Sequence, residues 1–322
     1  MEAKPYFSIV IPAYNREQEI RRAIRSCLSQ DFVDFEALVV DDGSIDGTGA
    51  AVLQESDARV RLITHAINRG VCPARNSGVR ESRAGWIVFL DSDHEMLPRC
   101  LSRAYSVAGG LPEEIGRFGF LYCFDSGGES PSPLPEQQDL DYEQWLKWIE
   151  NAQRSDALWF VRRATFAECM LPESYALEFS YWLDFTKRYG TRIIPEIGAI
   201  EHTDSAERLS EAGLPTNRQL MIQQARDRAE DWGRVLAEHG DALRRTAPRC
   251  HGTVLRAACL ASLLAGWRLE GIRAGGAGLR TRPFSPLSWA ALALSLAGTG
   301  PTRWALGLRR RPKARASRFL PA

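Results

Sequence analysis

The stretch that decides the fold is a short apolar run ending in two carboxylates one residue apart: Trp86-Ile87-Val88-Phe89-Leu90-Asp91-Ser92-Asp93. Because the run is short, β-branched and aromatic, and follows Gly85, it predicts a buried β-strand. Such a strand carries Asp91 and Asp93 to the carboxyl edge of its sheet, where open α/β sheets bind ligands. Neighbouring carboxylates repel each other unless a cation lies between them, so a divalent metal with a diphosphate fits them. Taken alone, the pattern also fits a solvated turn.

Strand and helix patterns alternate along the chain before this run. Apolar strand patterns occupy residues 7–15, 35–40 and 59–63. Helical patterns follow at residues 20–28, 50–55 and from 74 onward. The alternation predicts a mostly parallel sheet with helices on both faces. Polar side chains then close three strands at one edge of the sheet: Asn15, Asp41 with Asp42, and Asp91 with Asp93.

Four blocks in this part of the chain resemble family 2 inverting glycosyltransferases of the GT-A fold. The blocks are Ser8–Asn15 with Glu17, Val39–Ser44 with Asp46-Gly47-Thr48, Asn68–Gly78, and Phe89–Asp93 with Pro98. They occur in the family's order and spacing, which makes them far more specific together than singly. The resemblance implies a Rossmann-like, mostly parallel sheet with helices on both faces, followed here by a C-terminal helical region.

The resemblance also implies a nucleotide pocket. Pro12, Tyr14 and Glu17 would line the pocket for the base and ribose, and Asp42, together with Asp41, would hydrogen-bond the base. Two alternatives remain at this stage: Tyr14 could serve packing alone, and Asp42 could cap its own turn through its side chain.

The same resemblance implies a metal site with Mg²⁺ or Mn²⁺. Asp91 would face the ribose or the metal, and Asp93 would ligate the cation that bridges the diphosphate. A hard cation on oxygen ligands neutralises a diphosphate and so makes it a better leaving group. His202 matches a histidine that some members carry after their last strand, where it would touch the diphosphate or complete the metal shell. A solvated or structural histidine is the alternative.

Two further roles come from the resemblance. Arg75 would lie near the nucleotide or brace its loop, unless it is a solvated helix residue. Glu178 would be the general base that removes the proton of the acceptor hydroxyl. This alignment rests on Trp182-Leu183 and Lys187–Gly190, and it places Leu177 where the family has another acid. A shift by one residue would put Phe179 at the base position and leave no base.

Composition limits the class of protein. The 322 residues, 44% hydrophobic and 25% charged, are enough for a sizeable core and one or two domains. We expect a catalytic domain at residues 1–205 and a helical, basic region at 206–322. Seven scattered cysteines without a C-x-x-C pair, and no secretory signal in the first residues, favour reduced thiols in a cytoplasm.

Charge divides the chain unevenly. Residues 247–322 contain 13 Lys and Arg and the single acid Glu270, a net charge of +12, against −11 for residues 1–246. Apolar segments at 254–267 and 286–297, with tryptophans and flanking arginines, and the basic run 309–315 suit an anionic membrane surface. A helix packed on the catalytic domain and a disordered tail are the alternatives. Few aromatic residues interleave with the charges, so nucleic acid is not expected as a partner.

The sequence therefore predicts a metal-dependent inverting glycosyltransferase of the hexosyl type. It would move a sugar from a nucleotide-diphospho-sugar, with uridine the commoner base in the family, to a glycan or lipid-linked acceptor. Cell-surface polysaccharide synthesis at the inner face of the cell membrane would be its setting. One alternative is a catalytically degenerate binding module. The other, a sugar-phosphate nucleotidyltransferase, would need a glycine-rich loop where Pro12-Ala13-Tyr14-Asn15 stands.

Overall fold

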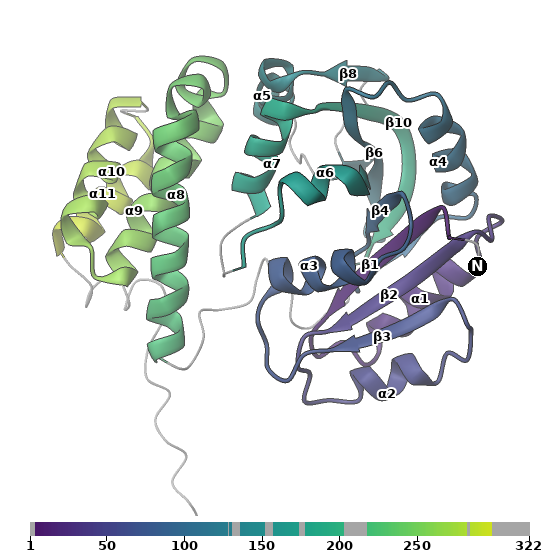
Figure 1. Ribbon diagram of the computed structural model, residues 1–322. Helices are drawn as coiled ribbons and strands as arrows, with labels where there is room; N and C mark the ends of the chain where they lie inside the picture. The colour runs from purple at the N-terminus through teal and green to yellow at the C-terminus, as the bar shows by residue number, and fades with distance from the viewer. Residues whose placement is uncertain are drawn as a thin grey trace, which may run out of the picture.

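A computed structural model of the chain describes residues 4–127, 129–130, 136–151, 157–173, 178–202, 218–281 and 284–297. Figure 1 shows a twisted sheet with helices on both faces and a group of further helices beside it. The strands are β1 (Phe7–Ala13), β2 (Phe35–Asp41), β3 (Val60–Thr64), β4 (Trp86–Phe89), β5 (His94–Met96), β6 (Ile115–Phe124), β7 (Glu129–Ser130), β8 (Gln138–Leu140), β9 (Leu158–Arg162) and β10 (Gly190–Glu201). The helices are α1 (Glu19–Leu28), α2 (Thr48–Leu53), α3 (Val71–Glu81), α4 (Cys100–Gly109), α5 (Tyr142–Asn151), α6 (Arg163–Glu168), α7 (Glu178–Arg188), α8 (Arg218–Thr246), α9 (Pro248–Ala265), α10 (Arg268–Thr281) and α11 (Pro286–Ala297).

The sheet of the described residues has ten strands, with the main order β3-β2-β1-β4-β9-β6-β10-β5. β1 to β4 are mutually parallel, as the strand–helix alternation predicts. β9 is antiparallel to both of its neighbours, β4 and β6. β6 and β10 therefore run in the same direction as β1 to β4, which confirms the mostly parallel sheet. The short strands β5, β7 and β8 pair antiparallel at the margins.

Alternate residues of the central strands feed two separate cores. On β1, Phe7, Ile9 and Ile11 join one core, with α1, α2 and α4. Val10 joins the other core, with α3, α5 and α7. This is the period-2 pattern of a strand covered on both faces. The resulting layers fix the positions of the loops that follow β1, β2 and β4.

Helix α3 lies unusually close to β1. A Cβ atom placed on Gly78 of α3 would lie 2.4 Å from Cγ1 of Val10, so only glycine fits this contact. The helix begins at Val71, three residues before the predicted start, after Gly70 adopts φ of +97°. Because α3 sits directly on the sheet, its polar side chains reach the loops at the carboxyl edge.

The C-terminal helices pack against the catalytic part of the chain. Trp232 of α8 contacts Phe179 of α7, with ring centroids 6.0 Å apart. The core that contains Val10 also includes Trp232 and Val254, so it continues from the sheet into α8 and α9. The expected division between residues 205 and 206 falls outside the described residues, and it stays a prediction. Among the helices described, none has both the length and the apolar character to span a membrane. The basic run 309–315 also lies outside the described residues.

Candidate active site

Three parallel strands end side by side and bring their polar residues to one edge. The ladder pairs Ala13 of β1 with Asp41 of β2. On its other side β1 pairs with β4. This pairing continues one residue past β4, because the backbone N–H of Leu90 donates to the carbonyl oxygen of Val10 at 3.1 Å. The loops that follow carry Asn15, Asp42 and the Asp91–Asp93 pair, so this edge is where the sequence placed it.

The loops after β1 and β2 are tied to each other. The side-chain oxygen of Asn15 accepts the N–H of Ile45 at 3.0 Å, and the Ser44 hydroxyl oxygen accepts the N–H of Asn15 at 2.9 Å. Asn15 adopts φ of +52°, a left-handed conformation that asparagine tolerates. Glu17, one of the predicted pocket residues, accepts the N–H of Gly47 at 3.2 Å and so braces the second loop.

The other predicted pocket residues differ in exposure. Pro12 is half-buried at the end of β1, and Tyr14 has 39% of its surface exposed. Asp41 is buried, and its carboxylate accepts the N–H of Ser44 at 2.9 Å. Tyr14 is therefore the residue of this group with an aromatic ring available to a ligand.

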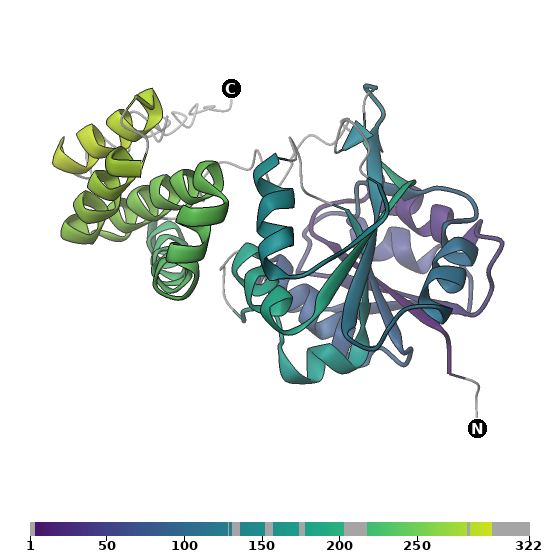
Figure 2. The same cartoon turned by 90° about the horizontal axis from the view of Figure 1, so that it is seen from above.

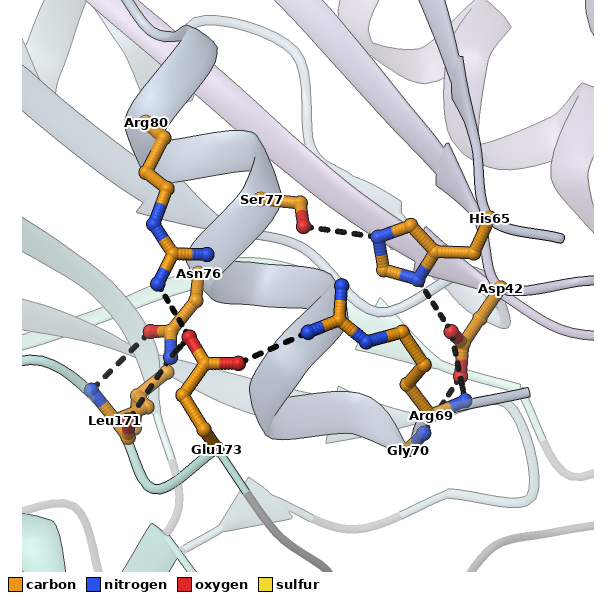
Figure 3. Close-up of polar contacts among 9 residues, drawn as sticks. All are labelled: Asp42, His65, Arg69, Gly70, Asn76, Ser77, Arg80, Leu171 and Glu173. Atoms are coloured by element: carbon orange, nitrogen blue, oxygen red, sulfur yellow. Dashed lines mark hydrogen bonds and ion pairs between the residues drawn. The ribbon is translucent and has the colours of Figure 1, made fainter. Parts of the chain in front are cut away.

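Asp42 holds the turn that leads into α3 (Figure 3). Its two oxygens accept the N–H of Arg69, each at 3.0 Å, and one also accepts the N–H of Gly70 at 2.7 Å. Nδ1 of His65 lies 2.6 Å from the same carboxylate, and Nε2 of His65 lies 2.8 Å from the Ser77 hydroxyl. The Asp42 side chain therefore caps a turn, but this is the turn at Arg69 and Gly70. The turn that follows β2 is instead capped by Asp41, which accepts the N–H of Ser44.

Sequence reasoning missed His65. It follows β3, and its N–H donates to the carbonyl oxygen of Asp41 at 2.9 Å, so it lies at the same carboxyl edge. Its position two residues beyond an expected strand was the available signal. No local pattern indicates that its ring joins Asp42 to α3.

Arg75 connects two carboxylates that are far apart in the sequence. Its Nη2 donates to Asp91 at 2.5 Å, and its Nη1 donates to Glu178. The guanidinium lies over the ring of Phe89, 5.2 Å from the ring centroid, and the arginine is 7% exposed. The structure therefore brings the predicted base, the predicted donor-side acid and Arg75 together.

The two acids of the Asp-x-Asp pair have opposite electrostatic environments. Burial, the largest single influence, disfavours ionisation of Asp91, but the charge and hydrogen bond of Arg75, together with smaller contributions from other basic side chains, lower the pKa of Asp91. Burial and the negative charge of Asp91 raise the pKa of Asp93. Within the described part of the chain, no arginine or lysine hydrogen-bonds the Asp93 carboxylate, and Nε2 of His94 lies 3.7 Å from its Oδ1. Two carboxylates in this arrangement suit a hard divalent cation such as Mg²⁺ or Mn²⁺.

His202 reaches the same edge. Its N–H donates to the carbonyl oxygen of Asp93 at 3.4 Å. Its Nε2 is 2.9 Å from Glu95, and its Nδ1 is 3.6 Å from Asp125. The ring is thus already engaged by two carboxylates beside Asp93, and its role as a metal ligand stays a prediction.

The segment before α7 is anchored to α3 and to the turn that precedes this helix. Asn76 forms two hydrogen bonds with the backbone of Leu171, at 2.8 and 3.1 Å. Glu173 accepts from Asn76 at 2.9 Å and Arg69 at 3.2 Å, and it pairs with Arg80 (Figure 3). These contacts hold the chain just before α7, and sequence reasoning assigned no role to Glu173.

The first residues of α7 separate the two alignments considered for the base. Glu178 points to Arg75. The ring of Phe179 instead packs between Trp145 and Trp232, at centroid distances of 6.4 and 6.0 Å. Leu177 lies outside the described residues. Glu178 therefore occupies the site side of the helix, while Phe179 belongs to the core.

A second histidine–carboxylate cluster lies on the other side of α7. Ligand atoms of Asp184, Glu238 and His239 lie within 4.8 Å of one another. Arg234 already hydrogen-bonds Asp184 at 2.6 Å and Glu238 at 3.3 Å. Since the arginine neutralises these acids, we interpret the cluster as a link between α7 and α8 and not as a metal site.

The comparisons with known proteins agree with this geometry. The sequence model of Glycosyl transferase family 2 matches residues 8–166. An uncharacterized glycosyltransferase of Haemophilus influenzae is 37% identical over 196 residues, which are 59% of this chain and 75% of that protein. The chain belongs to glycosyl transferase family 2, and the resemblance stated from its motifs is confirmed.

Two further relatives match over shorter stretches. The succinoglycan biosynthesis protein ExoO of Rhizobium meliloti is 46% identical over 111 residues, 34% of this chain and 32% of that protein. The UDP-Glc:alpha-D-GlcNAc-diphosphoundecaprenol beta-1,3-glucosyltransferase WfgD of Escherichia coli is 42% identical over 86 residues, 27% of this chain and 34% of that protein. The matched stretches thus span about a third of the length of these two relatives.

Solved structures show the same fold. The S. aureus protein TarS (residues 1–349), in complex with UDP-GlcNAc, aligns with a TM-score of 0.56 at 18% identity, over 84% of this chain and 89% of that one. The mannosyltransferase PcManGT of Pyrobaculum calidifontis, in complex with GDP-Man and Mn²⁺, aligns with a TM-score of 0.51 at 17% identity, over 92% of this chain and 88% of that one. At these identities the likeness concerns the fold, and the expected GT-A fold is confirmed.

Proposed function

We propose that this chain transfers a sugar from a nucleoside-diphosphate sugar to a glycan or lipid-linked acceptor, with inversion at the anomeric carbon. The observation that carries the proposal is the position of Arg75 between Asp91 and Glu178. It joins Asp91, one of the two acids expected at the donor diphosphate, to the one acid expected at the acceptor hydroxyl. A donor and an acceptor bound on the two sides of this arginine would meet between them.

The donor would lie across the ends of β1, β2 and β4. The exposed ring of Tyr14 would face the base, and Pro12 and Glu17 would shape the pocket with Asp41. The Asp42 oxygens are occupied by the turn and by His65, so Asp42 would act on the base pocket chiefly by fixing that turn. Its direct hydrogen bond with the base stays a prediction. A UDP-sugar is the donor we propose, as expected from the family resemblance and consistent with the UDP-GlcNAc complex of TarS.

Asp93 and Asp91 would hold Mg²⁺ or Mn²⁺, with His202 as the third candidate. When bound, the cation would neutralise the diphosphate and so assist its departure. The metal in the PcManGT complex supports this choice for a related fold. Arg75, already at Asp91, would add a positive charge close to the leaving group.

Glu178 would perform the proton transfer. Its carboxylate would accept the proton of the acceptor hydroxyl as the oxygen attacks the anomeric carbon. The bond between that carbon and the diphosphate oxygen breaks on the opposite side, which inverts the configuration. Arg75 orients Glu178 before the acceptor arrives, because the two side chains are paired.

The acceptor class and location come from the relatives and the composition. One relative acts on a diphosphoundecaprenol-linked sugar, and another is a succinoglycan biosynthesis protein. We therefore propose a role in cell-surface polysaccharide synthesis, carried out in the cytoplasm at the inner face of the cell membrane.

A thermal-shift screen tests the donor part of the proposal. Nucleoside diphosphates would be added to the purified chain with and without Mn²⁺, since a ligand of the folded state raises the melting temperature. We expect a rise for UDP that needs Mn²⁺ and is lost in Asp93→Ala. A folded sample with no shift for any nucleotide would contradict the proposal. A shift without any release of nucleoside diphosphate from a donor sugar would instead support the degenerate binding module.

A further inference from the structure

Helix α11 buries its serines and exposes three of its large apolar side chains. Its two serines are buried, with Ser288 1% exposed and Ser295 0% exposed. Leu287, Trp289 and Leu296 face outward, with exposed fractions of 66%, 57% and 55%. The helix Pro286–Ala297 has no charged residue. A surface helix of a soluble protein buries its apolar stripe and exposes polar side chains, so a face that exposes large apolar side chains to water is unusual.

Small residues explain why the serines point inward. The backbone of Leu292 lies 3.3 Å from the Cβ position of Gly275 on α10, and the Ser288 hydroxyl lies 3.9 Å from that of Gly278. The Ser295 hydroxyl donates to the carbonyl oxygen of Leu292 at 2.7 Å, so its polar atom needs no water. Glycine and serine let two helices approach closely, a packing typical of helices in an apolar medium. Leu287, Trp289 and Leu296 are thereby left on the outside, while Leu292 and Leu294 are half-buried.

Neighbouring residues extend this apolar face and add positive charge. Phe284, just before α11, is 95% exposed, and Leu269 of α10 is 66% exposed. Arg273 and Arg280 of α10 are also exposed. α10 and α11 lie on the side of the helical region that faces away from the sheet (Figures 1 and 2). Nothing in the catalytic part that the structure describes covers this side.

We propose that Leu269, Phe284, Leu287, Trp289 and Leu296, here called the α11 face, dock the chain on an anionic lipid bilayer. The occupant follows from charge: residues 247–322 carry a net +12, and cations beside an apolar helix face attract anionic headgroups. Twelve helical residues extend about 18 Å, too short for a hydrocarbon core of about 30 Å. The helix would therefore lie in the plane of the interface. A membrane is where a lipid-linked acceptor would be found, and only this link between docking and acceptor rests on the proposed function.

Vesicle flotation of the full chain tests this directly. Vesicles of phosphatidylcholine alone would be compared with vesicles that also contain phosphatidylglycerol. We expect the chain to float with the anionic vesicles and to bind the neutral ones more weakly. Leu287→Glu with Trp289→Glu should lower the partition coefficient by about tenfold or more, because two apolar anchors are lost and two negative charges are added.

The matched control is Val33→Glu with Leu53→Glu. These residues are also exposed and apolar, at 74% and 71%, but lie in the catalytic part. Their flotation should equal that of the unchanged chain. Equal losses in both double variants would overturn the proposal, because they would show a general effect of added negative charge.

A second pair of variants avoids the apolar contacts. Arg273→Gln and Arg280→Gln should each reduce binding to anionic vesicles by about fivefold and leave binding to neutral vesicles unchanged. This result supports the proposal even if the glutamate variants fail to fold. Binding to anionic vesicles that is unaffected by both the arginine and the glutamate variants would overturn it.

Two readouts separate this surface from the active site and from other occupants. Asp93→Ala should float normally, and the α11-face variants should keep the nucleotide-dependent thermal shift. Light scattering at several concentrations would detect a second copy on the α11 face. A dimer that the glutamate variants convert to a monomer would overturn the proposal in favour of a second copy as the occupant. An unchanged chain that binds neither type of vesicle would also overturn it.

Discussion

The proposed donor side and the proposed acceptor side of the site around α3 hold their carboxylates in different ways. On the donor side, Asp42 is fixed largely by backbone N–H groups of the turn at Arg69 and Gly70. On the acceptor side, Glu178 is held by the Arg75 side chain, and Glu173 by side chains of Asn76 and two arginines. Backbone donors cannot change rotamer, whereas arginine side chains can. From this comparison we expect the proposed base pocket at Asp42 to be preformed, while the proposed acceptor side can adjust to its substrate.

The largest expected effect separates the two sides at the metal. Asp93→Ala should lower the transfer rate by about a thousandfold or more, because an unneutralised diphosphate is a poor leaving group. It should also weaken nucleotide binding in Mn²⁺, as a donor-side residue must. Product formation and calorimetric titration measure the two effects. Asp139→Ala on β8 is the control, and full activity of Asp93→Ala would remove Asp93 from the metal site.

The second prediction concerns the acceptor side. Glu178→Gln keeps the size of the side chain but removes the base, and should lower kcat by about 10²- to 10⁴-fold. The Kd for the nucleoside diphosphate should change far less than kcat, since Glu178 would contact the acceptor directly and would influence the donor only through Arg75. Steady-state kinetics with a titration of UDP would measure both. An unchanged kcat would assign the base role to another group, and an equal loss of nucleotide affinity would blur the division between the two sides.

The third prediction concerns the support that both sides share. Gly78→Ala places a methyl group against Val10, and overpacking of this kind costs about 1–3 kcal/mol of unfolding free energy. Because α3 carries both sides, nucleotide affinity and kcat should fall together. Gly85→Ala is the matched control, since no atom lies within 4 Å of its Cβ position. Urea unfolding gives the free energies of unfolding. Equal values for the two variants would show that α3 shifts to accommodate the methyl group without a loss of stability.

The fourth prediction tests how far the donor turn is preformed. His65→Phe removes the bonds to Asp42 and Ser77, and a lost buried hydrogen bond costs about 1–2 kcal/mol. We expect the Kd for UDP to rise by about tenfold, at the same energy scale, with kcat at saturating donor nearly unchanged. His65→Gln, which can still bond one partner, should recover part of the affinity. A fall in kcat with an unchanged Kd would place His65 outside the donor pocket.

The smallest expected effect is a pH dependence where the helical region joins the catalytic part. Burial lowers the pKa of His239, and the charge of Asp184 opposes this only partly. The neutral ring accepts the hydroxyl proton of Tyr142 at 2.7 Å and donates to Asp184 at 2.9 Å. Since the unfolded pKa is the higher one, this contribution to stability is complete above about pH 6.5 and declines as the pH falls below it.

Urea unfolding of the unchanged chain and of His239→Gln would measure that contribution. The difference in unfolding free energy between them should shrink as the pH is lowered from neutral. His251 is also buried with a lowered pKa, so the variant should keep part of the pH dependence. A difference that grows at low pH would mean that His239 is charged in the folded chain.

The sequence predicted the parallel half of the sheet well, and for a physical reason. β1, β2 and β4 are covered on both faces, so almost every residue in them is apolar and the strands stand out from the loops. The polar residues that follow then mark the carboxyl edge without further information. Asp91 and Asp93 could be placed there because a local pattern is enough.

The remaining features depend on contacts between distant residues. Arg75 and Glu178 are 103 residues apart in the chain, and no local spacing encodes their pairing. The insertion of antiparallel β9 between β4 and β6 likewise follows from tertiary packing. The alignment leaves Glu178 and Phe179 open, and Glu178 is preferred as the only acid in the stretch Tyr175–Leu183; the structure then places the Phe179 ring in the core. The inward orientation of the α11 serines could not be predicted either, because an apolar helix sequence does not indicate which face packs against a neighbouring helix.

Sharing one guanidinium between two carboxylates has a thermodynamic consequence. Any ligand that competes for Asp91 changes how strongly Arg75 holds Glu178, and any ligand that engages Glu178 changes how strongly Arg75 holds Asp91. Linkage requires the two effects to be equal in free energy. If a bound donor changes the affinity for the acceptor by some factor, a bound acceptor must change the affinity for the donor by the same factor. Each substrate would thus alter the affinity for the other through the Arg75 side chain, without the motion of a domain or lid.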